Sequence, residues 1–270
     1  MALADLHTHT SASDGQYPPA QLVALAKTAG LQVLAITDHD TLDGLDAGVQ
    51  AGKANGLTVL RGVELGAREH RYLHILGLNL SLDCTALVQL CQKLKTSRIE
   101  RGQRIIDFLN EKGIFLSLEE VEEQAGGDVL ARPHFAQVMV RHGYVASTKE
   151  AFDRYLDTEE YQRIERFKAP VADCIQAIHQ GGGKAVLAHP YQLRLPDEEL
   201  EKTVQSLKAQ GLDGLECFYP KHTPEQQAFY LHLAQKYQLH CTAGSDFHGE
   251  RVHPGDRILS TDLELDWLGI

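Results

Sequence analysis

Leu6-His7-Thr8-His9 ends the first apolar run of the chain, and Ile36-Thr37-Asp38-His39-Asp40 ends the second. Successive side chains of a β-strand point to opposite faces, so His7 and His9 are expected on the same face. Asp14 follows in the next loop. Strand interiors rarely carry imidazoles and carboxylates, whereas a divalent-metal hydrolase needs both where strands end. These stretches therefore predict a metalloenzyme whose ligands lie at strand ends.

Alternating strand and helix patterns continue outward from this start. Pro18-Pro19 precedes an apolar helical run that stops at Gly30, and Thr223-Pro224-Glu225-Gln226 is a capping box. The alternation predicts a parallel sheet, either open or closed into a barrel. Seven apolar segments are predicted to be its strands: Ala2–Leu6, Val33–Ile36, Leu57–Val63, Tyr72–Leu76, Lys184–Ala188, Gly214–Phe218 and Leu239–Ala243.

The alternation stops between about Leu82 and Lys168, where no convincing strand pattern occurs. Ser117-Leu118-Glu119-Glu120 and Ser147-Thr148-Lys149-Glu150 are capping boxes that start helices in this stretch. We predict a helix from Leu82 that leads into a helical insertion over residues 99–166. Residues 1–98 and 167–270 then form the sheet-containing domain.

Composition narrows the class of protein. The net charge of −11 over 270 residues argues against broad binding of nucleic acid through phosphate neutralisation, so duplex DNA is not an expected partner. No stretch is long enough to cross a bilayer, and the first residues lack the basic and apolar regions of a secretory signal. The five scattered cysteines suit reduced thiols, so a cytoplasmic location is expected.

Potential metal ligands follow nearly every predicted strand. In a barrel of strands and helices, the strand ends and the loops after them converge on one rim, where active sites lie. The residues concerned are His7, His9, Asp14, His39, Glu64, His74, His189, Asp246 and His248.

Each motif alone has an ordinary alternative. Asp246-Phe247-His248 could be a loop turn, because aspartate favours turns. Isolated histidines elsewhere are better explained as surface or satisfied core residues; they are His142, His179, His222, His232, His240 and His253. The joint occurrence of ligand types at successive strand ends is what favours a metal site.

The chain resembles the polymerase and histidinol phosphatase (PHP) family over nearly its whole length. The motifs that carry the resemblance are, in order, HTHTSASDG, AITDHDT, GVELG, HILG, RPHFA, LAHP and GSDFHG. The resemblance implies a distorted (β/α)7 TIM-like barrel of the α/β class, with two or three manganese, zinc or iron ions. The insertion most resembles the bacterial branch that dephosphorylates nucleoside 3′,5′-bisphosphates and trims short RNA from its 5′ end.

The resemblance also implies roles for individual residues. His7, His9, Glu64 and Asp246 would hold the first metal, and Asp14, His39 and His248 the second. Glu64 would bridge to a third metal held also by His74 and His134. Glu64, Asp246 and His189 are the predicted catalytic residues, with the role of His189 open between ligand, phosphate donor and general acid. Asp14 replaces a histidine of some relatives, which favours Mn²⁺ over Zn²⁺.

Arginines supply candidate substrate contacts. Arg98, Arg101 and Arg104 recur every three residues on the predicted helix, and Arg132 lies two residues before His134. Guanidinium groups bind phosphate through paired hydrogen bonds. The alternative is a solvated helix face paired with acidic residues, which remains equally plausible for Arg104. We predict that Arg98, Arg101, Arg132 and His134 contact the substrate, and that the insertion contributes to the substrate pocket.

The resulting hypothesis is a metal-dependent phosphatase that converts nucleoside 3′,5′-bisphosphates to nucleoside 5′-monophosphates and phosphate. Its expected partners are small nucleotides and short RNA oligonucleotides. Two alternative activities stay open: histidinol-phosphate phosphatase, and hydrolysis of phosphodiesters in RNA or DNA by the same metals. A non-catalytic PHP interaction module is disfavoured, because every expected ligand position holds a competent ligand. The sequence leaves the oligomeric state undetermined.

Overall fold

The computed structural model describes residues 1–125 and 130–270. It divides into two compact units, one of residues 1–91 and 168–270 and the other of residues 92–167. The division falls inside helix α3 (Thr85–Glu111), and so lies earlier than the boundary at residue 99 expected from the sequence. Among the described residues, no helix has the length and apolar character needed to cross a bilayer.

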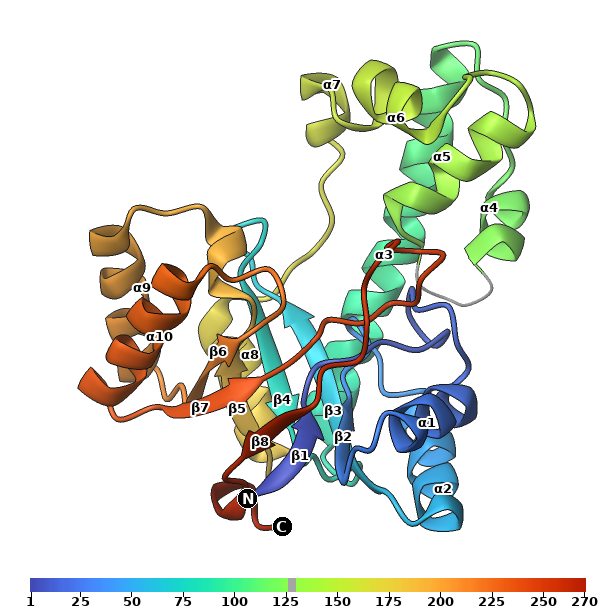
Figure 1. Ribbon diagram of the computed structural model, residues 1–270. Coiled ribbons are helices and arrows are strands. Elements are labelled where there is room, and N and C mark those ends of the chain that lie inside the picture. Colours follow the sequence, from blue (N-terminus) through green and yellow to red (C-terminus); the bar gives the residue numbers. More distant parts are fainter. Residues whose placement is uncertain (126–129) are drawn as a thin grey trace. The chain divides into compact units, whose positions relative to one another are not determined.

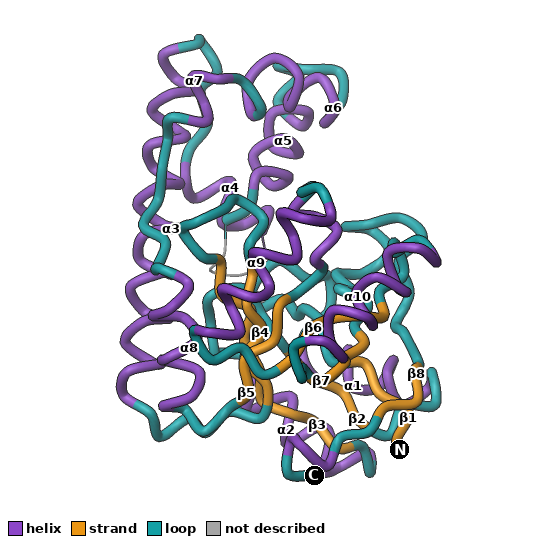
Figure 2. Tube along the Cα trace, turned by 90° about the vertical axis from the view of Figure 1, so that its left-hand side faces the viewer, coloured by secondary structure: helices purple, strands orange, loops and turns teal. Residues whose placement is uncertain are grey.

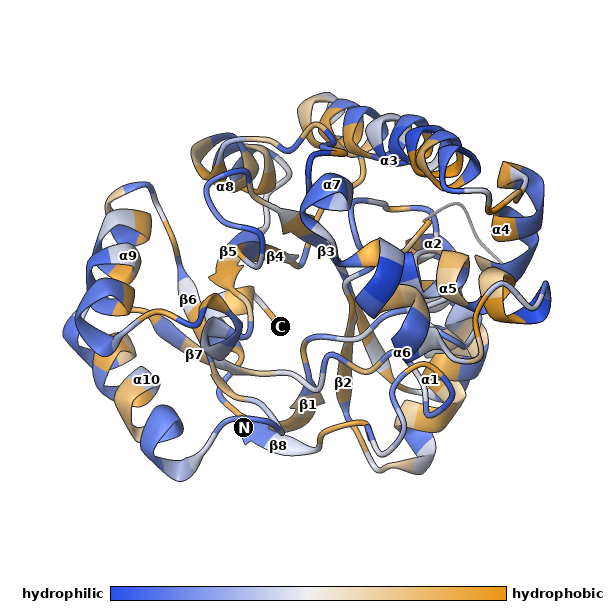
Figure 3. Ribbon diagram, turned by 90° about the horizontal axis from the view of Figure 1, so that it is seen from above, coloured by the Kyte–Doolittle hydropathy of each residue, from blue (hydrophilic) through white to orange (hydrophobic). Residues whose placement is uncertain are grey.

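The first unit is a barrel of eight strands in the order β7-β6-β5-β4-β3-β2-β1-β8, with helices outside it (Figure 3). An α/β barrel of this kind confirms the fold class predicted from the sequence. The strands are β1 (Ala2–Asp5), β2 (Val33–Ile36), β3 (Thr58–Gly66), β4 (His74–Leu78), β5 (Lys184–Leu187), β6 (Gly214–Phe218), β7 (His240–Ala243) and β8 (Thr261–Leu263).

Strand β4 corrects the expectation of an all-parallel sheet. It runs antiparallel to both β3 and β5. The connection from Gly66 to His74 is too short for the helical crossover of about a dozen residues that parallel neighbours require. Because β4 is reversed, His74 begins the strand and pairs with Gly66 at the end of β3. A residue expected near the end of its strand thus reaches the same rim from the strand's beginning.

The barrel closes where the segment that follows β1 pairs with the end of β7 and the residues after it. The amide of Leu6 donates to Ala243 at 2.9 Å, and the amide of His9 donates to Phe247 at 3.0 Å. Beside β1 lies the antiparallel strand β8, which the sequence analysis missed. The two chain ends lie near each other at this edge (Figures 1 and 2).

The helices of the first unit follow local sequence signals. Pro19 starts α1 (Pro19–Thr28), and Gly56 ends α2 (Leu45–Asn55) in the left-handed conformation that glycine adopts without strain. Thr223 and Gln226 form the expected capping box of α10 (Pro224–Lys236). The other elements of this unit are α8 (Val171–Gln180), α9 (Asp197–Ala209), and the short turns η2 (Pro190–Leu193) and η3 (Asp266–Leu268).

The second unit is helical and has its own apolar core. Phe135, Met139 and Tyr161 are buried there together with Ile105 and Leu109 of α3. Ser117 and Glu120 form the capping box that the sequence predicts. Its remaining elements are α4 (Leu118–Ala125), α5 (Arg132–Arg141), α6 (Thr148–Ala151), the π-helical turn η1 (Phe152–Leu156) and α7 (Glu159–Gln162).

The segment after β7 completes the core inside the barrel. Leu263, Leu265 and Leu268 are buried against residues of the central strands such as Leu76 and Val186. The side-chain amide of Asn79 donates to the carbonyl of Leu268 at 2.7 Å. This segment is therefore part of the fold that supports the strand ends.

We expect Leu268→Ala to lower the free energy of unfolding by about 2–5 kcal/mol, the usual cost of truncating a buried leucine. Urea unfolding followed by circular dichroism measures this change. The exposed Asp262 of β8 offers a control, because Asp262→Ala should shift stability by no more than about 0.5 kcal/mol. Equal effects of the two substitutions would contradict the core role of Leu268.

Candidate metal centre

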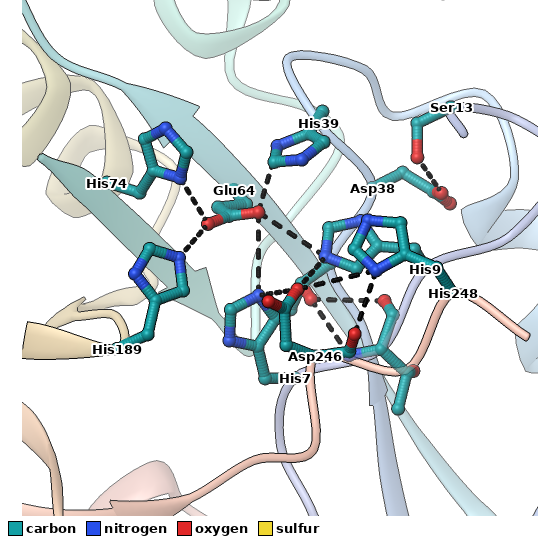
Figure 4. A network of polar contacts seen from close by, with 12 residues as sticks. His7, His9, Ser13, Asp38, His39, Glu64, His74, His189, Asp246 and His248 are labelled. Carbon is teal, nitrogen blue, oxygen red and sulfur yellow. Dashed lines mark hydrogen bonds and ion pairs between the residues drawn. The ribbon is translucent and has the colours of Figure 1, made fainter. Parts of the chain in front are cut away.

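Imidazole and carboxylate groups meet at one rim of the barrel (Figure 4). His7 and His9 follow β1, His39 follows β2, and Glu64 lies within β3. The remaining members come from the other side of the barrel and from the loop after β1. They are Asp14, His74 at the start of β4, His189 after β5, and Asp246 and His248 after β7.

Three overlapping groups have ligand atoms close enough to share a metal ion. Within each group, these atoms lie within 4.8 Å of one another. The groups are His7, His9, Glu64 and Asp246; His9, Asp14, His39 and His248; and His39, Glu64 and His74. The structure thus brings together every metal ligand predicted in the barrel.

Glu64 is the centre of the arrangement and has no exposed surface. Its Oε1 lies 2.7 Å from His74 Nδ1 and 2.9 Å from His189 Nε2. Its Oε2 lies 2.9 Å from His39 Nδ1. A carboxylate with imidazoles on both oxygens can bridge two metal ions, which in such sites lie about 3.5–4 Å apart.

Neighbouring charges fix the ionisation of this site. Burial raises the pKa of Glu64, but His39, His74 and His7 hold it well below its usual range. Burial lowers the pKa of His9 to about 3 and that of His74 to about 4. Ionised carboxylates and neutral imidazoles are the forms that bind metals.

His248 shows how strongly negative the surroundings are. Burial lowers its pKa, yet Asp14 and Asp246 raise it to about 10. The same two carboxylates have pKa values held well below their usual range by the nearby histidines, in spite of burial. A divalent cation would take the place of a proton on such an imidazole, since metal binding releases protons from its ligands.

Unpartnered buried atoms test whether a metal fits. Among the described residues, His7 Nε2, both ring nitrogens of His9 and Glu64 Oε2 are buried and form no contact with the geometry of a hydrogen bond, although His39 Nδ1 lies 2.9 Å from Glu64 Oε2 and His9 Nε2 lies 3.1 Å from Asp246 Oδ1. Buried polar atoms without partners are costly and normally rare. A divalent ion would satisfy them together, and a donor set of nitrogen and oxygen without thiolate suits Mn²⁺, Fe²⁺ or Zn²⁺. The residues present therefore fit the metals that the sequence implies.

The structure places His134 and His189, the two histidines whose predicted roles differ most from those of the other ligands. His134 lies in the second unit, where its Nδ1 accepts a hydrogen bond from the amide of Ala131 at the start of α5. It belongs to none of the three groups, and its ligand role stays a prediction. His189 contacts the same Glu64 oxygen as His74. We therefore propose His189 as the partner of Glu64 and His74 at a third metal.

Buried carboxylates behind the ligands were not identified from the sequence. Asp38 accepts hydrogen bonds from the amide and hydroxyl of Thr10, both at 2.7 Å, and from the Ser13 hydroxyl at 2.6 Å. Burial raises the pKa of Asp38 to about 6 in spite of these donors. Asp5 accepts from the amide and hydroxyl of Ser245. The sequence did contain a signal for these two carboxylates: Asp5 lies within an apolar strand, and Asp38 lies shortly after one.

The predicted substrate arginines form a cluster within the second unit. Arg101 Nε donates to the carbonyl of Ile164 at 2.7 Å, and its guanidinium lies over the ring of Tyr161. Arg132 pairs with Asp157 at 2.9 Å. Burial lowers the pKa of Arg101, and the nearby Arg132 and Arg98 lower it further. Arg101 and Arg132 are thus each held by partners within the second unit, and their contact with substrate stays a prediction.

Comparison with known proteins identifies related sequences and structures. The sequence model of the PHP domain family matches residues 5–209 of this chain. A 5′-3′ exoribonuclease of Haemophilus influenzae is 35% identical over 245 residues, covering 90% of this chain and 89% of the relative. A phosphoribosyl 1,2-cyclic phosphate 1,2-diphosphodiesterase of Eggerthella lenta is 33% identical over 264 residues, 94% of this chain and 98% of the relative.

Two further matches come from Chromobacterium violaceum. A 3′,5′-nucleoside bisphosphate phosphatase is 30% identical over 251 residues, 92% of this chain and 88% of the relative. The solved structure of an amidohydrolase with bound SO4 and no metal matches with a TM-score of 0.84 at 28% identity, covering 97% of this chain and 92% of that one.

The chain therefore belongs to the PHP domain family. Together with the donor groups around Glu64, this membership defines a metal-dependent phosphoesterase.

We expect Glu64→Ala and Asp246→Ala to reduce phosphoester hydrolysis by more than about 100-fold, beyond the usual cost of losing an outer-shell partner of a metal. Both variants should also bind less metal, as measured by elemental analysis after gel filtration. The exposed His232 provides a control, because His232→Gln should retain activity and metal. Full activity of either variant, or of thoroughly chelated protein, would contradict the assignment.

Proposed function

We propose that this protein hydrolyses the 3′-phosphate of nucleoside 3′,5′-bisphosphates and releases a nucleoside 5′-monophosphate and inorganic phosphate. The observation that carries the proposal is the set of groups around Glu64 that could hold divalent metal ions, in a chain 30% identical to a 3′,5′-nucleoside bisphosphate phosphatase. The second unit also carries Arg98, Arg101 and Arg132, whose guanidinium groups suit a second phosphate.

The barrel residues account for the chemical step. Nine residues of the rim would hold two or three divalent ions: His7, His9, Asp14, His39, Glu64, His74, His189, Asp246 and His248. When bound, these ions supply activation of water and stabilisation of charge on the phosphoryl oxygens. Water adds to the 3′-phosphorus, the bond from phosphorus to the ribose 3′ oxygen breaks, and that oxygen takes up a proton.

Other side chains orient the ligands. The Tyr219 hydroxyl donates to Asp246 Oδ2 at 3.1 Å, which limits rotation of that carboxylate. We propose Mn²⁺ as the physiological metal, because the carboxylate of Asp14 adds a hard oxygen donor to the second site.

The arginines account for selectivity. We assign the 5′-phosphate, which is retained, to Arg98, Arg101 and Arg132. Each guanidinium can form two parallel hydrogen bonds to phosphate, and binding energy from a part of the substrate that does not react positions the ester for attack. Histidinol phosphate carries a single phosphate and would leave this cluster unused.

Trimming of short RNA from its 5′ end is the second candidate function. It is favoured by the 35% identity to a relative named 5′-3′ exoribonuclease. The chemistry is the same. In a 5′-phosphorylated RNA, the bond that breaks joins the 3′ oxygen of the first nucleotide to the phosphorus that links it to the second nucleotide, and the first nucleotide leaves as a nucleoside 5′-monophosphate.

The bond that breaks can be identified by ³¹P NMR. Adenosine 3′,5′-bisphosphate should yield AMP and inorganic phosphate, with AMP itself barely hydrolysed, because AMP has no 3′-phosphate to react. Histidinol phosphate and a ribose 1,2-cyclic phosphate serve as competing substrates. Release of adenosine 3′-monophosphate, or a marked preference for either competitor, would overturn the proposal.

The arginine assignment has a separate kinetic test. Arg98→Ala, Arg101→Ala and Arg132→Ala should each lower kcat/KM for the bisphosphate by about 10–150-fold, the equivalent of a charged hydrogen bond worth about 1.5–3 kcal/mol. An aryl phosphate, which lacks the second phosphate, should be affected much less. The exposed Arg104 on the same helix gives the matched control Arg104→Ala. Equal losses for both substrates would mean that the arginines are structural.

A further inference from the structure

Glu216 is a buried carboxylate to which no role has been assigned above. It lies in the middle of β6 and has no exposed surface. Across the described residues, it forms an ion pair with His7 and with no lysine or arginine. A buried carboxylate is costly unless it is paired and hydrogen-bonded, so its contacts should reveal its role.

One oxygen of Glu216 contacts a metal-ligand candidate from behind. Glu216 Oε1 lies 3.1 Å from His7 Nδ1. On the opposite side of the ring, His7 Nε2 lies 3.4 Å from Glu64 Oε2 and 3.4 Å from Asp246 Oδ1. A carboxylate oxygen accepts the hydrogen bond of an imidazole N–H, so this contact places the proton on Nδ1 and leaves Nε2 to bind a metal.

The other oxygen of Glu216 holds a second histidine through its backbone. The amide of His189 donates to Glu216 Oε2 at 2.6 Å. His189 has φ +27°, a conformation that residues other than glycine seldom adopt without support. Its side chain reaches Glu64 Oε1 at 2.9 Å. One carboxylate therefore fixes a histidine after β1 and a histidine after β5.

Gly244 packs so closely against Glu216 and His7 that only a residue without a side chain fits there. A Cβ atom at Gly244 would lie 2.2 Å from Glu216 Oε1 and 2.3 Å from His7 Cβ. Real Cβ atoms do not approach other atoms so closely, so any larger residue would push Glu216 and His7 apart. The backbone after β7 is thus shaped to keep these two side chains in contact.

We propose that Glu216 is a positioning residue for metal binding, which fixes the tautomer of His7 and the backbone of His189. It does not touch substrate, and it acts through these two histidines. The inference rests on the metal site and is independent of which phosphoester is the substrate.

The test compares two variants of matched chemistry. Asp213 also contacts a histidine ring, that of His179 at 2.7 Å, and accepts from a backbone amide, that of Ala185 at 2.9 Å. His179 belongs to none of the metal-binding groups found in the described residues. Titration calorimetry of metal-free protein with Mn²⁺ should show binding about 10–100-fold weaker for Glu216→Gln. Asp213→Asn should bind as the unmodified protein does.

Long-range ¹H–¹⁵N NMR of histidine-labelled protein reads the tautomer directly. In the unmodified protein loaded with Zn²⁺, we expect the proton of His7 on Nδ1, with the resonance assigned by its loss in His7→Asn. With Zn²⁺ bound, the Nδ1–H resonance of His7 should shift in Glu216→Gln, because that proton then faces a neutral amide in place of a carboxylate. The part of this measurement made on the unmodified protein does not depend on how well Glu216→Gln folds.

Three results would overturn the inference. They are a proton on Nε2 of His7 in the unmodified protein, unchanged Mn²⁺ affinity of a folded Glu216→Gln, and equal loss of affinity in Asp213→Asn. Failure of the nucleotide assays would leave all three readouts intact, so the proposed substrate and the role of Glu216 are tested separately.

Discussion

The fully buried Glu64 carboxylate is the group on which the rest of the site depends. An ionised carboxylate loses several kcal/mol of hydration when it is buried, and only close partners of opposite or dipolar character can offset that loss. Here imidazoles approach both oxygens, and they come from strands on either side of β3. The barrel makes this possible because it directs several strand ends to one point.

Backbone pairing at the rim explains how the ligands keep their places. His39 forms a bridge with Glu64, and Thr8 forms one with Phe247, beyond the ends of the regular strands. His39, Glu64 and the residues on either side of Thr8 and Phe247 therefore stand on backbone that continues the sheet's hydrogen bonding. The relative positions of His39 and Glu64 follow from the register of β2 and β3, which is fixed by the buried side chains along both strands.

Much of the barrel could be predicted because its signals are local. Val33–Ile36 and Gly214–Phe218 have the same bounds in sequence and structure, since uninterrupted apolar runs mark buried strands. The reversed direction of β4 was missed, although the short connection before it carried that information. Strand β8 has only three residues, and the middle one is the exposed Asp262. The sequence therefore contains no apolar run that would predict this strand.

The site was predictable to the extent that its residues lie in motifs. His7, His9 and Asp246 occur in short segments of unusual composition, and strand geometry then brings them together. Glu216 carries no such signal, because a single glutamate in an apolar strand does not show what it will face. Its partners lie 209 and 27 residues away in the sequence, and only the closed barrel brings them into contact.

The outer carboxylates explain why the ligand geometry is stiff as well as close. Asp38 ties the loop that carries Asp14 to β2, and Asp5 ties the loop that carries Asp246 to β1. Glu216 joins His7 to His189 in the same way. Each of these three carboxylates therefore connects the ends of two different strands. A displacement of one metal ligand would break hydrogen bonds that hold another ligand. Metal affinity in such a site depends on these connections as well as on the ligands, because a preorganised shell loses little entropy when an ion binds.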